Sequence, residues 1–278
     1  MAETLSELLR ERYGRSPSVP EGLESSPELR AIAAHRSHRR FADRPVPDAL
    51  LDTLLACAFA APSKSDLQQS CVIDVREPSL RALFVELIPS MAWIGEAPVF
   101  LVFCGENRRI RRICEMRGPA FANDHLDSFF NASVDAALVM MSFIHAAEAA
   151  GLGCCPVSAV RIHARRLSDA MGLPAHVFPV AGLALGYPGQ ARKITPRLGL
   201  AASVHRDRYD DSRLPELLDE YDRRRDAVLP LAPDKQRRPD QFGVAAFYGW
   251  SEDKARQVAV RERGDFGAFA RDQGFSLD

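Results

Sequence analysis

Several signatures of common protein classes are missing from this sequence. Its six cysteines include no CxxC pair and follow no framework spacing, and its seven histidines form no HExxH motif. We therefore expect free, buried thiols in a cytosolic setting, with no disulfide framework and no structural or catalytic metal.

A strong charge of either sign is also missing. Lys and Arg total 36 against 37 acidic residues, so the formal net charge is -1. No global field draws such a chain to nucleic acid or to an anionic membrane, so any ligand must be recognised locally. The opening segment MAETLSELLRERYG carries acids and lacks a hydrophobic signal core, which favours a cytoplasmic protein.

The chain does contain one long apolar helix, predicted from Leu126 to Gly153. Its main apolar stripe consists of Phe130, Val134, Ala137, Met141, Ile144 and Ala147. Acidic residues interrupt the segment too often for a membrane span. We expect this helix to be the interior column of a domain or the seam of a dimer.

The remaining pattern predicts short strands and helices that do not alternate as βαβ units. Strands are expected over 71–75, 97–105 and 176–186, and helices over 27–34, 45–60, 79–88, 161–171, 210–225 and 251–273. Thr4 and Glu7 have the spacing of a capping box for a first helix. This order favours an α+β fold in which helices sandwich a sheet. The GLGCCP segment lacks the last glycine of GxGxxG and follows a helix, which excludes a Rossmann nucleotide site.

Three basic segments are candidate binding sites. The segment HRSHRRF, which begins at His35, combines a hydroxyl with guanidinium groups, a set that suits phosphate, although a solvated basic corner explains the charge equally well. Lys193 and Arg197 form a second basic pair. The arginines between Asn107 and Arg117 are typical of a solvated helix face, with nucleic-acid contact a distant second.

Five segments in one order resemble the FMN-dependent nitroreductase and flavin reductase family, in particular its larger NADPH-preferring group. They are HRSHRRF, APSKSDLQQ, the buried helix ending in GLG, LALGYP and PRLGLAASVHRDRY. The resemblance runs from about His35 to Tyr209 and resumes in the C-terminal tail. It implies a nitroreductase-like α+β fold with a mixed, mainly antiparallel sheet sandwiched by helices, and an intertwined homodimer. It also implies one FMN-binding domain over 1–278, with 1–26 as an N-terminal helix and linker and 210–278 as an extension packing on the dimer.

The resemblance also implies which residues hold the cofactor. FMN phosphate and ribityl contacts are implied for His35, Arg36, Ser37, Arg39 and Arg197, with Lys193 beside them. Arg39 is further implied as the electrostatic stabiliser of the flavin N1/O2 edge. Contacts to the flavin of the partner subunit are implied for Ser63, Lys64, Ser65, Asp66 and Gln68. The loop Cys154–Ala159, through Pro156, Val157, Ser158 and Ala159, is implied to lie along the flavin, although it lacks the family's glycines.

The function implied is NAD(P)H-dependent oxidoreduction. Hydride would pass from NADPH through flavin N5 to a small-molecule acceptor, namely a nitroaromatic, a quinone or free flavin, with ping-pong kinetics and no side-chain acid, base or nucleophile. Lys235, Arg237 and Arg238 are candidates for the NADPH phosphate, and a disordered basic loop is the alternative. A flavin-binding protein with little reductase activity, or a specialised reductive dehalogenation or flavin-remodelling member of the fold, is the alternative function.

Overall fold

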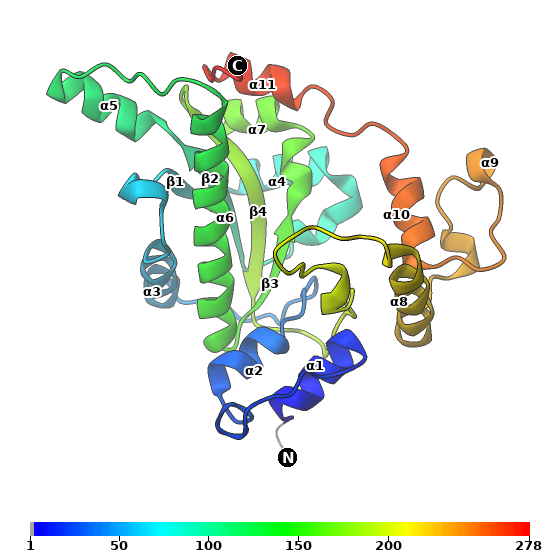
Figure 1. The fold of residues 1–278 in the computed structure, drawn as a ribbon. Helices are drawn as coiled ribbons and strands as arrows, with labels where there is room; N and C mark the ends of the chain where they lie inside the picture. Colours follow the sequence, from blue (N-terminus) through cyan, green and yellow to red (C-terminus); the bar gives the residue numbers. More distant parts are fainter. Residues whose placement is uncertain (1–2) are drawn as a thin grey trace. The chain divides into compact units, whose positions relative to one another are not determined.

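The computed structural model describes residues 3–278, which fall into two compact units (Figure 1). The sheet unit comprises Ser37–Arg192 and Arg263–Asp278. The helical unit comprises the residues up to Arg36 together with Lys193–Glu262. Each unit is described separately below.

The sheet unit is built on four antiparallel strands in the order β1-β2-β4-β3. Their bounds are Ser70–Asp74 for β1, Val99–Glu106 for β2, Gly153–Val157 for β3 and Val177–Gly186 for β4. The structure thus confirms the predicted α+β class and three of its strands. The fourth strand, β3, was expected to be a loop, and this expectation is wrong. It escaped the sequence pattern because it is only five residues long and lies between the turn at Gly151 and a 3-10 helix that begins at Ser158.

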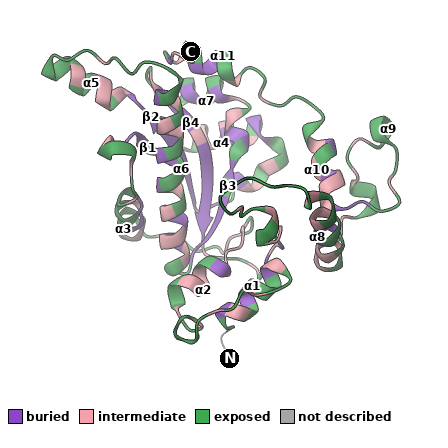
Figure 2. Ribbon diagram, viewed as in Figure 1, coloured by how far each residue is buried: buried purple, intermediate pink, exposed green. Residues whose placement is uncertain are grey.

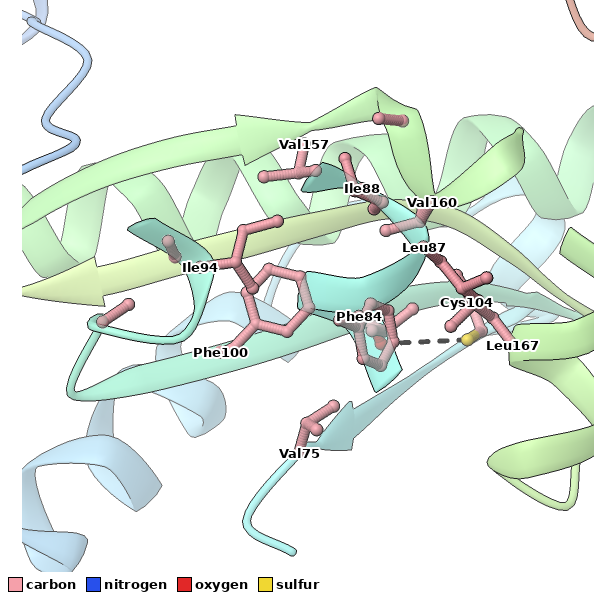
Figure 3. Packing of buried hydrophobic residues seen from close by; sticks show 14 of the residues in the cluster. Val75, Phe84, Leu87, Ile88, Ile94, Phe100, Cys104, Val157, Val160 and Leu167 are labelled. Carbon is pink, nitrogen blue, oxygen red and sulfur yellow. Dashed lines mark hydrogen bonds between the residues drawn. The ribbon is translucent and has the colours of Figure 1, made fainter. Parts of the chain in front are cut away.

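Both faces of the sheet are covered by helices, as predicted. On β2 the side chains alternate, so that Val99, Leu101 and Phe103 pack against α6 (Leu126–Ala149) and α3 (Asp48–Phe59). Their neighbours pack on the other face against α4 (Pro78–Leu87) and α7 (Ala164–Ala170). On that face, the rings of Phe84 and Phe100 meet edge to face at 5.0 Å (Figure 3). Strands β2, β3 and β4 are accordingly buried over most of their length (Figure 2), while β1 is fully buried only at Ser70.

The central helix α6 is buried on one side only. Ala132, Ala136, Val139 and Phe143 are among its buried residues. The predicted stripe is divided, because Ile144 and Ala147 are buried while others of its members lie in an exposed line. That exposed apolar line consists of Phe130, Val134, Leu138 and Met141. By length and composition α6 is the one helix within 3–278 that would span a membrane, but it packs along the sheet as a core helix does.

The helical unit contains α1 (Leu5–Tyr13), α2 (Pro27–Ala33), α8 (Leu214–Val228), α9 (Pro239–Phe242) and α10 (Trp250–Val258). The predicted capping box is present, since Thr4 Oγ1 accepts from the Glu7 amide and the Glu7 carboxylate accepts from the Thr4 amide. Leu5 and Leu8 pack with Ala33 and Ile194 to form the core beneath α1 and α2. This core places the segment around Ile194 against the first two helices.

The C-terminal helix is broken, contrary to the prediction of one helix over 251–273. After α10 the chain passes through Arg263, whose φ of 54° is left-handed, and forms α11 (Phe266–Asp272) in the sheet unit. There Phe269 and Phe275 pack against Phe178. The remaining elements are α5 (Arg108–Arg117) and the 3-10 helices Glu21–Leu23, Lys64–Asp66, Pro89–Ile94, Ser158–Arg161, Leu200–Ala202 and Pro233–Lys235.

Candidate functional site

Arg12 connects two of the predicted phosphate-binding segments within the helical unit. This buried side chain donates through Nη2 to the carbonyl oxygens of Ala33 at 2.8 Å and His35 at 2.7 Å. Its Nη1 donates to the Thr195 carbonyl oxygen at 3.2 Å. One guanidinium therefore fixes the backbone just before Arg36 and the backbone that leads to Arg197.

The sequence prediction did not include Arg12. A signal was nevertheless present, because Leu5, Leu8 and Arg12 share one helical face at spacings of three and four residues. A charged side chain that continues an apolar stripe can be buried only where hydrogen-bond or ion-pair partners compensate its charge.

Arg12, Arg36 and Arg197 form an arginine cluster in the helical unit. Burial lowers the pKa of Arg12, and repulsion from the neighbouring Arg197 and Arg36 lowers it further. The buried Nε of Arg36 has no hydrogen-bond partner. Its Nη2 lies 3.9 Å from the carboxylate of Glu3, which is 56% exposed. Three positive charges thus face one distant, exposed carboxylate, so the cluster favours a negatively charged ligand.

Arg197 itself is held by its backbone rather than by its side chain. Its amide donates to the Arg12 carbonyl oxygen at 2.8 Å, and its carbonyl oxygen accepts from Arg224 at 2.5 Å. The guanidinium is exposed and forms no ion pair with any residue in 3–278. Lys193 is exposed at the start of the same segment. The structure therefore leaves the charge of Arg197 available to a ligand.

In the sheet unit, the segment Ser37–Arg39 runs along strand β3. Ser37 forms a parallel bridge with Cys154, and the His38 amide donates to the Cys154 carbonyl oxygen at 2.9 Å. Gly153 is required for this approach, because a Cβ there would lie 2.7 Å from the His38 ring. The predicted phosphate and ribityl residues of this segment thus lie beside β3, whose residues were predicted to form a loop along the flavin.

Arg39 and Cys155 interact across this pairing. Burial raises the pKa of the Cys155 thiol, and the hydrogen-bonded guanidinium of Arg39 opposes that rise. The guanidinium is otherwise exposed. Arg39 therefore lies beside strand β3 with its side chain exposed.

The residues after Cys155 alternate between the core and the surface. Pro156 and Ser158 are exposed, whereas Val157 and Ala159 are buried in the core against α4. Only the first two can offer a side chain to a ligand, and the buried pair can offer only backbone groups.

The predicted flavin loop from Ser63 to Gln69 is held by α6. Ser63 Oγ donates to the buried carboxylate of Asp135 at 2.7 Å and accepts from the Gln68 amide at 2.7 Å. Gln68 Nε2 donates to Asp66 Oδ1 at 3.1 Å. The side chains of Lys64, Ser65, Asp66 and Gln68 are exposed. Asp135 was seen in the sequence only as an interruption of an apolar helix, so its role was missed.

A cavity of about 430 Å³ lies beside this loop. Its polar side includes Ser63, Gln68 and Asp135, and Phe59 and Val139 are on its apolar side. Such a mixed lining suits a planar apolar group with a few polar atoms.

The basic segment near residue 237 has defined contacts within the helical unit. Arg237 Nε pairs with Asp253 Oδ1 at 3.0 Å, and Arg238 donates to the Arg256 carbonyl oxygen. Lys235 pairs with the exposed Asp234 at 3.3 Å. The charge of Arg237 is therefore compensated, while Arg238 keeps its full charge because its partner is a neutral carbonyl.

Comparison with known proteins identifies this class of protein. The sequence matches the Nitroreductase family domain over residues 32–187 and the Nitroreductase family, C-terminal domain, over residues 195–278. The first match alone covers more than half of the chain. The chain belongs to the nitroreductase family, a family of oxidoreductases.

Individual relatives agree with this membership. The chain is 30% identical over 224 residues to an FMN reductase [NAD(P)H] of Bacillus subtilis, covering 79% of this chain and 90% of the relative. It is 32% identical over 202 residues to an oxygen-insensitive NADPH nitroreductase of Salmonella typhimurium, covering 70% and 82%. The solved structure of B. megaterium NfrA2 superposes with a TM-score of 0.81 at 29% identity, covering 90% of this chain and 98% of that one.

Proposed function

We propose that this protein is an FMN-dependent NAD(P)H oxidoreductase that reduces nitroaromatics, quinones or free flavin. Family membership and the activities named for its relatives support the general reaction. The observation that carries the proposal is the arginine cluster, in which the buried Arg36 Nε has no partner. A buried donor of this kind calls for an acceptor, and a phosphate supplies several.

The residues of the cluster fit the phosphate of FMN. Arg36 and Arg197 would bind its oxygens, while Arg12 would hold the two backbone segments and add positive potential. His35 and Lys193 flank the same segments. When bound, FMN would supply the redox chemistry, accepting hydride from the nicotinamide and delivering it to the acceptor in two half-reactions with ping-pong kinetics.

The sheet unit would contribute orientation and electrostatics. Arg39, which lies beside Cys155, would place positive charge where negative charge develops at the N1/O2 edge of the ring. Ser37, Pro156, Ser158 and the exposed residues of the 63–69 loop would contact the flavin. No side-chain acid, base or nucleophile is needed for this role.

The helical unit also carries the candidate site for the NADPH phosphate. Arg238 donates to a neutral carbonyl, and Lys235 pairs only with the exposed Asp234, an ion pair that water screens, whereas the buried Asp253 neutralises Arg237. We assign Lys235 and Arg238 to the phosphate and Arg237 to holding the segment in place. A 2'-phosphate would pair with such cations, which would favour NADPH over NADH.

The exposed apolar line of α6 supports a homodimer. Phe130 is 61% exposed, and Val134, Leu138 and Met141 continue its stripe. An apolar stripe along a core helix is costly to leave in water, and a second copy of this chain would cover it. Such a dimer, cytoplasmic and acting on small molecules, has no need of a nucleic-acid or membrane partner.

Purification and anaerobic reduction test the proposal. The purified protein should be yellow with one FMN per chain, and NADPH should bleach it without oxygen. The bleached protein should then be reoxidised by nitroaromatic, quinone or flavin acceptors in a screen that also includes NADH. Protein that stays colourless with excess FMN would refute the proposal. FMN retained without bleaching would identify a flavin-binding protein with little reductase activity.

A further inference from the structure

The loop from Ser63 to Gln69 adopts a backbone that its own sequence does not favour. Ser65, Asp66 and Gln68 have φ values of 51°, 56° and 51°, all in the left-handed region, and none of them is glycine. Three such residues in one short loop persist only when surrounding contacts determine their conformation. The contacts responsible should therefore be visible in the structure.

Asp135 supplies these contacts from α6. Its Oδ1 accepts from the Lys64 amide at 3.1 Å, and its Oδ2 accepts from Ser63 Oγ at 2.7 Å and from the Gln69 amide at 2.9 Å. The carboxylate is 1% exposed and forms no ion pair with any residue in 3–278. Its negative charge is thus satisfied by the two ends of one loop.

Ser63 extends the influence of Asp135 into the middle of the loop. Its hydroxyl donates to Asp135 and accepts from the Gln68 amide at 2.7 Å. The carboxylate therefore holds the Gln68 amide indirectly, through the Ser63 hydroxyl. The amides of Lys64, Gln68 and Gln69 thus end, directly or through Ser63, at Asp135, while those of Asp66 and Leu67 donate within the loop to the carbonyl oxygens of Ser63 and Lys64.

The opposite side of the loop is held by the start of α5. Arg109 Nη1 donates to the Gln68 carbonyl oxygen at 2.7 Å, and Asn107 Nδ2 donates to Gln69 Oε1 at 2.7 Å. These contacts involve Gln68, Gln69 and Ser70, but not the region from Ser63 to Asp66. Asp135 is therefore the group that closes the loop.

We propose that Asp135 is a positioning residue for FMN binding, which fixes the strained 63–69 loop in a binding-ready conformation before the cofactor arrives. The inference rests on the proposed function, because it assigns the exposed Lys64, Ser65 and Gln68 to the flavin. A preformed loop binds more tightly, since no conformational cost is met on binding. If only a fraction of molecules has the loop in place, the apparent Kd for FMN rises in inverse proportion to that fraction.

Asp135→Asn is the decisive variant. The side-chain amide of asparagine presents one carbonyl oxygen and one NH2 group, so either the Lys64 or the Gln69 amide would face a donor. If the loop is then in place about one tenth to one hundredth of the time, the Kd for FMN rises about tenfold to a hundredfold. Fluorescence quenching of FMN measures this Kd, and activity that is low at limiting FMN should recover as FMN is added. A merely destabilised protein would also recover with added ligand, so hydrogen exchange without FMN is needed to separate the two cases.

Hydrogen exchange of the FMN-free protein tests the contact independently of the cofactor. The amides of Lys64, Gln68 and Gln69 should exchange about tenfold faster or more in Asp135→Asn, because their acceptors are disturbed. Asp127→Asn is the matched control, since Asp127 is an exposed acid on the same helix. Its loop amides and its FMN affinity should equal those of the wild type. If Asp135→Asn does not fold, Ser63→Ala removes a single bridging hydroxyl and should give a smaller change of the same kind.

The outcomes separate this inference from the proposed function. Wild-type protein that binds no FMN would overturn both. Wild-type protein that binds FMN, with a variant whose loop amides exchange faster but whose Kd is within about twofold of wild type, would overturn the positioning role alone. Unchanged amide exchange in the variant would also overturn it, because the carboxylate would not be holding the loop. Faster exchange together with a weakened, FMN-rescued enzyme is the result we expect.

Discussion

The guanidinium of Arg12 donates to the carbonyl oxygen of His35 at 2.7 Å, from the last turn of α1 to the residue before Arg36. The same side chain reaches the carbonyl of Thr195, two residues before Arg197. The geometry of the proposed phosphate site therefore depends on a residue that would not itself need to touch the ligand.

Replacing Arg12 by methionine should weaken both the fold and the site. It leaves the carbonyl oxygens of Ala33, His35 and Thr195 without their donor, and a buried polar group left unpaired costs about 1 to 3 kcal/mol. We expect the free energy of unfolding in urea to fall by at least about 2 kcal/mol. Arg10→Met, at an exposed position of α1, should change it by less than about 0.5 kcal/mol. Equal losses in the two variants would contradict the role assigned to Arg12.

Removing Arg36 and Arg197 together should produce protein without FMN. Two charge-assisted contacts to a phosphate are worth about 1.5 to 3 kcal/mol each, so the Kd should rise by about two to four orders of magnitude. Absorbance of the purified Arg36→Ala/Arg197→Ala variant measures the bound flavin. Arg223→Ala removes an exposed arginine of α8 and should leave the protein yellow. Stoichiometric FMN in the double variant would refute the phosphate assignment.

The sequence predicted those parts of the fold whose apolar pattern is long. Strands β2 and β4 and helix α6 were found in this way, because each is nearly continuous in apolar residues. Strand β3 was missed because it is short and is held by its pairing with β4, a contact distant in sequence. The break before α11 was missed because the helical pattern continues through a residue with left-handed φ, Arg263.

The residues of the candidate site likewise fall into those that the sequence predicted and those that it missed. Arg36, Arg39 and Arg197 were proposed from a local pattern and a resemblance, and the structure leaves their charges available. Asp135 and Arg12 were missed because their partners are far along the chain. These partners include backbone atoms, which a pattern of side chains does not reveal. Both are buried charged residues, and their burial can be recognised only once the positions of their helices in the fold are known.

Asp253 gives the candidate NADPH segment a predictable dependence on pH. Burial raises the pKa of this carboxyl, but Lys254, Arg237 and the Tyr248 hydroxyl outweigh burial, so its pKa lies below the ordinary value of 3.8. The ionised carboxylate therefore stabilises the folded state at pH values above about 4, and this stabilisation is lost as the pH falls through the lowered pKa.

Unfolding of Asp253→Asn as a function of pH checks this dependence. The free energy of unfolding of the variant should be below that of the wild type from about pH 5 to pH 7, and the difference should shrink as the pH falls below about 4. Asp219→Asn, which alters an exposed acid on α8, should show no such convergence. A wild-type advantage that persists unchanged at pH 3 would mean that the charge of Asp253 does not hold the segment.

The exposed apolar line of α6 makes the proposed dimer testable at single positions. Phe130 and Val134 lie one helical turn apart and are 61% and 37% exposed, so lysines there should leave the isolated chain folded. In a dimer the same lysines would bury charge in an apolar seam and forfeit about 1.5 to 3 kcal/mol per apolar side chain, enough to shift assembly to the monomer at micromolar concentration. Sedimentation velocity over a range of concentrations distinguishes the two states. Met116→Lys, which changes a 70% exposed residue of α5, is the control and should remain dimeric. If the Phe130→Lys/Val134→Lys protein sediments as a dimer, the second copy does not use this face of α6, and the exposed line must have another explanation.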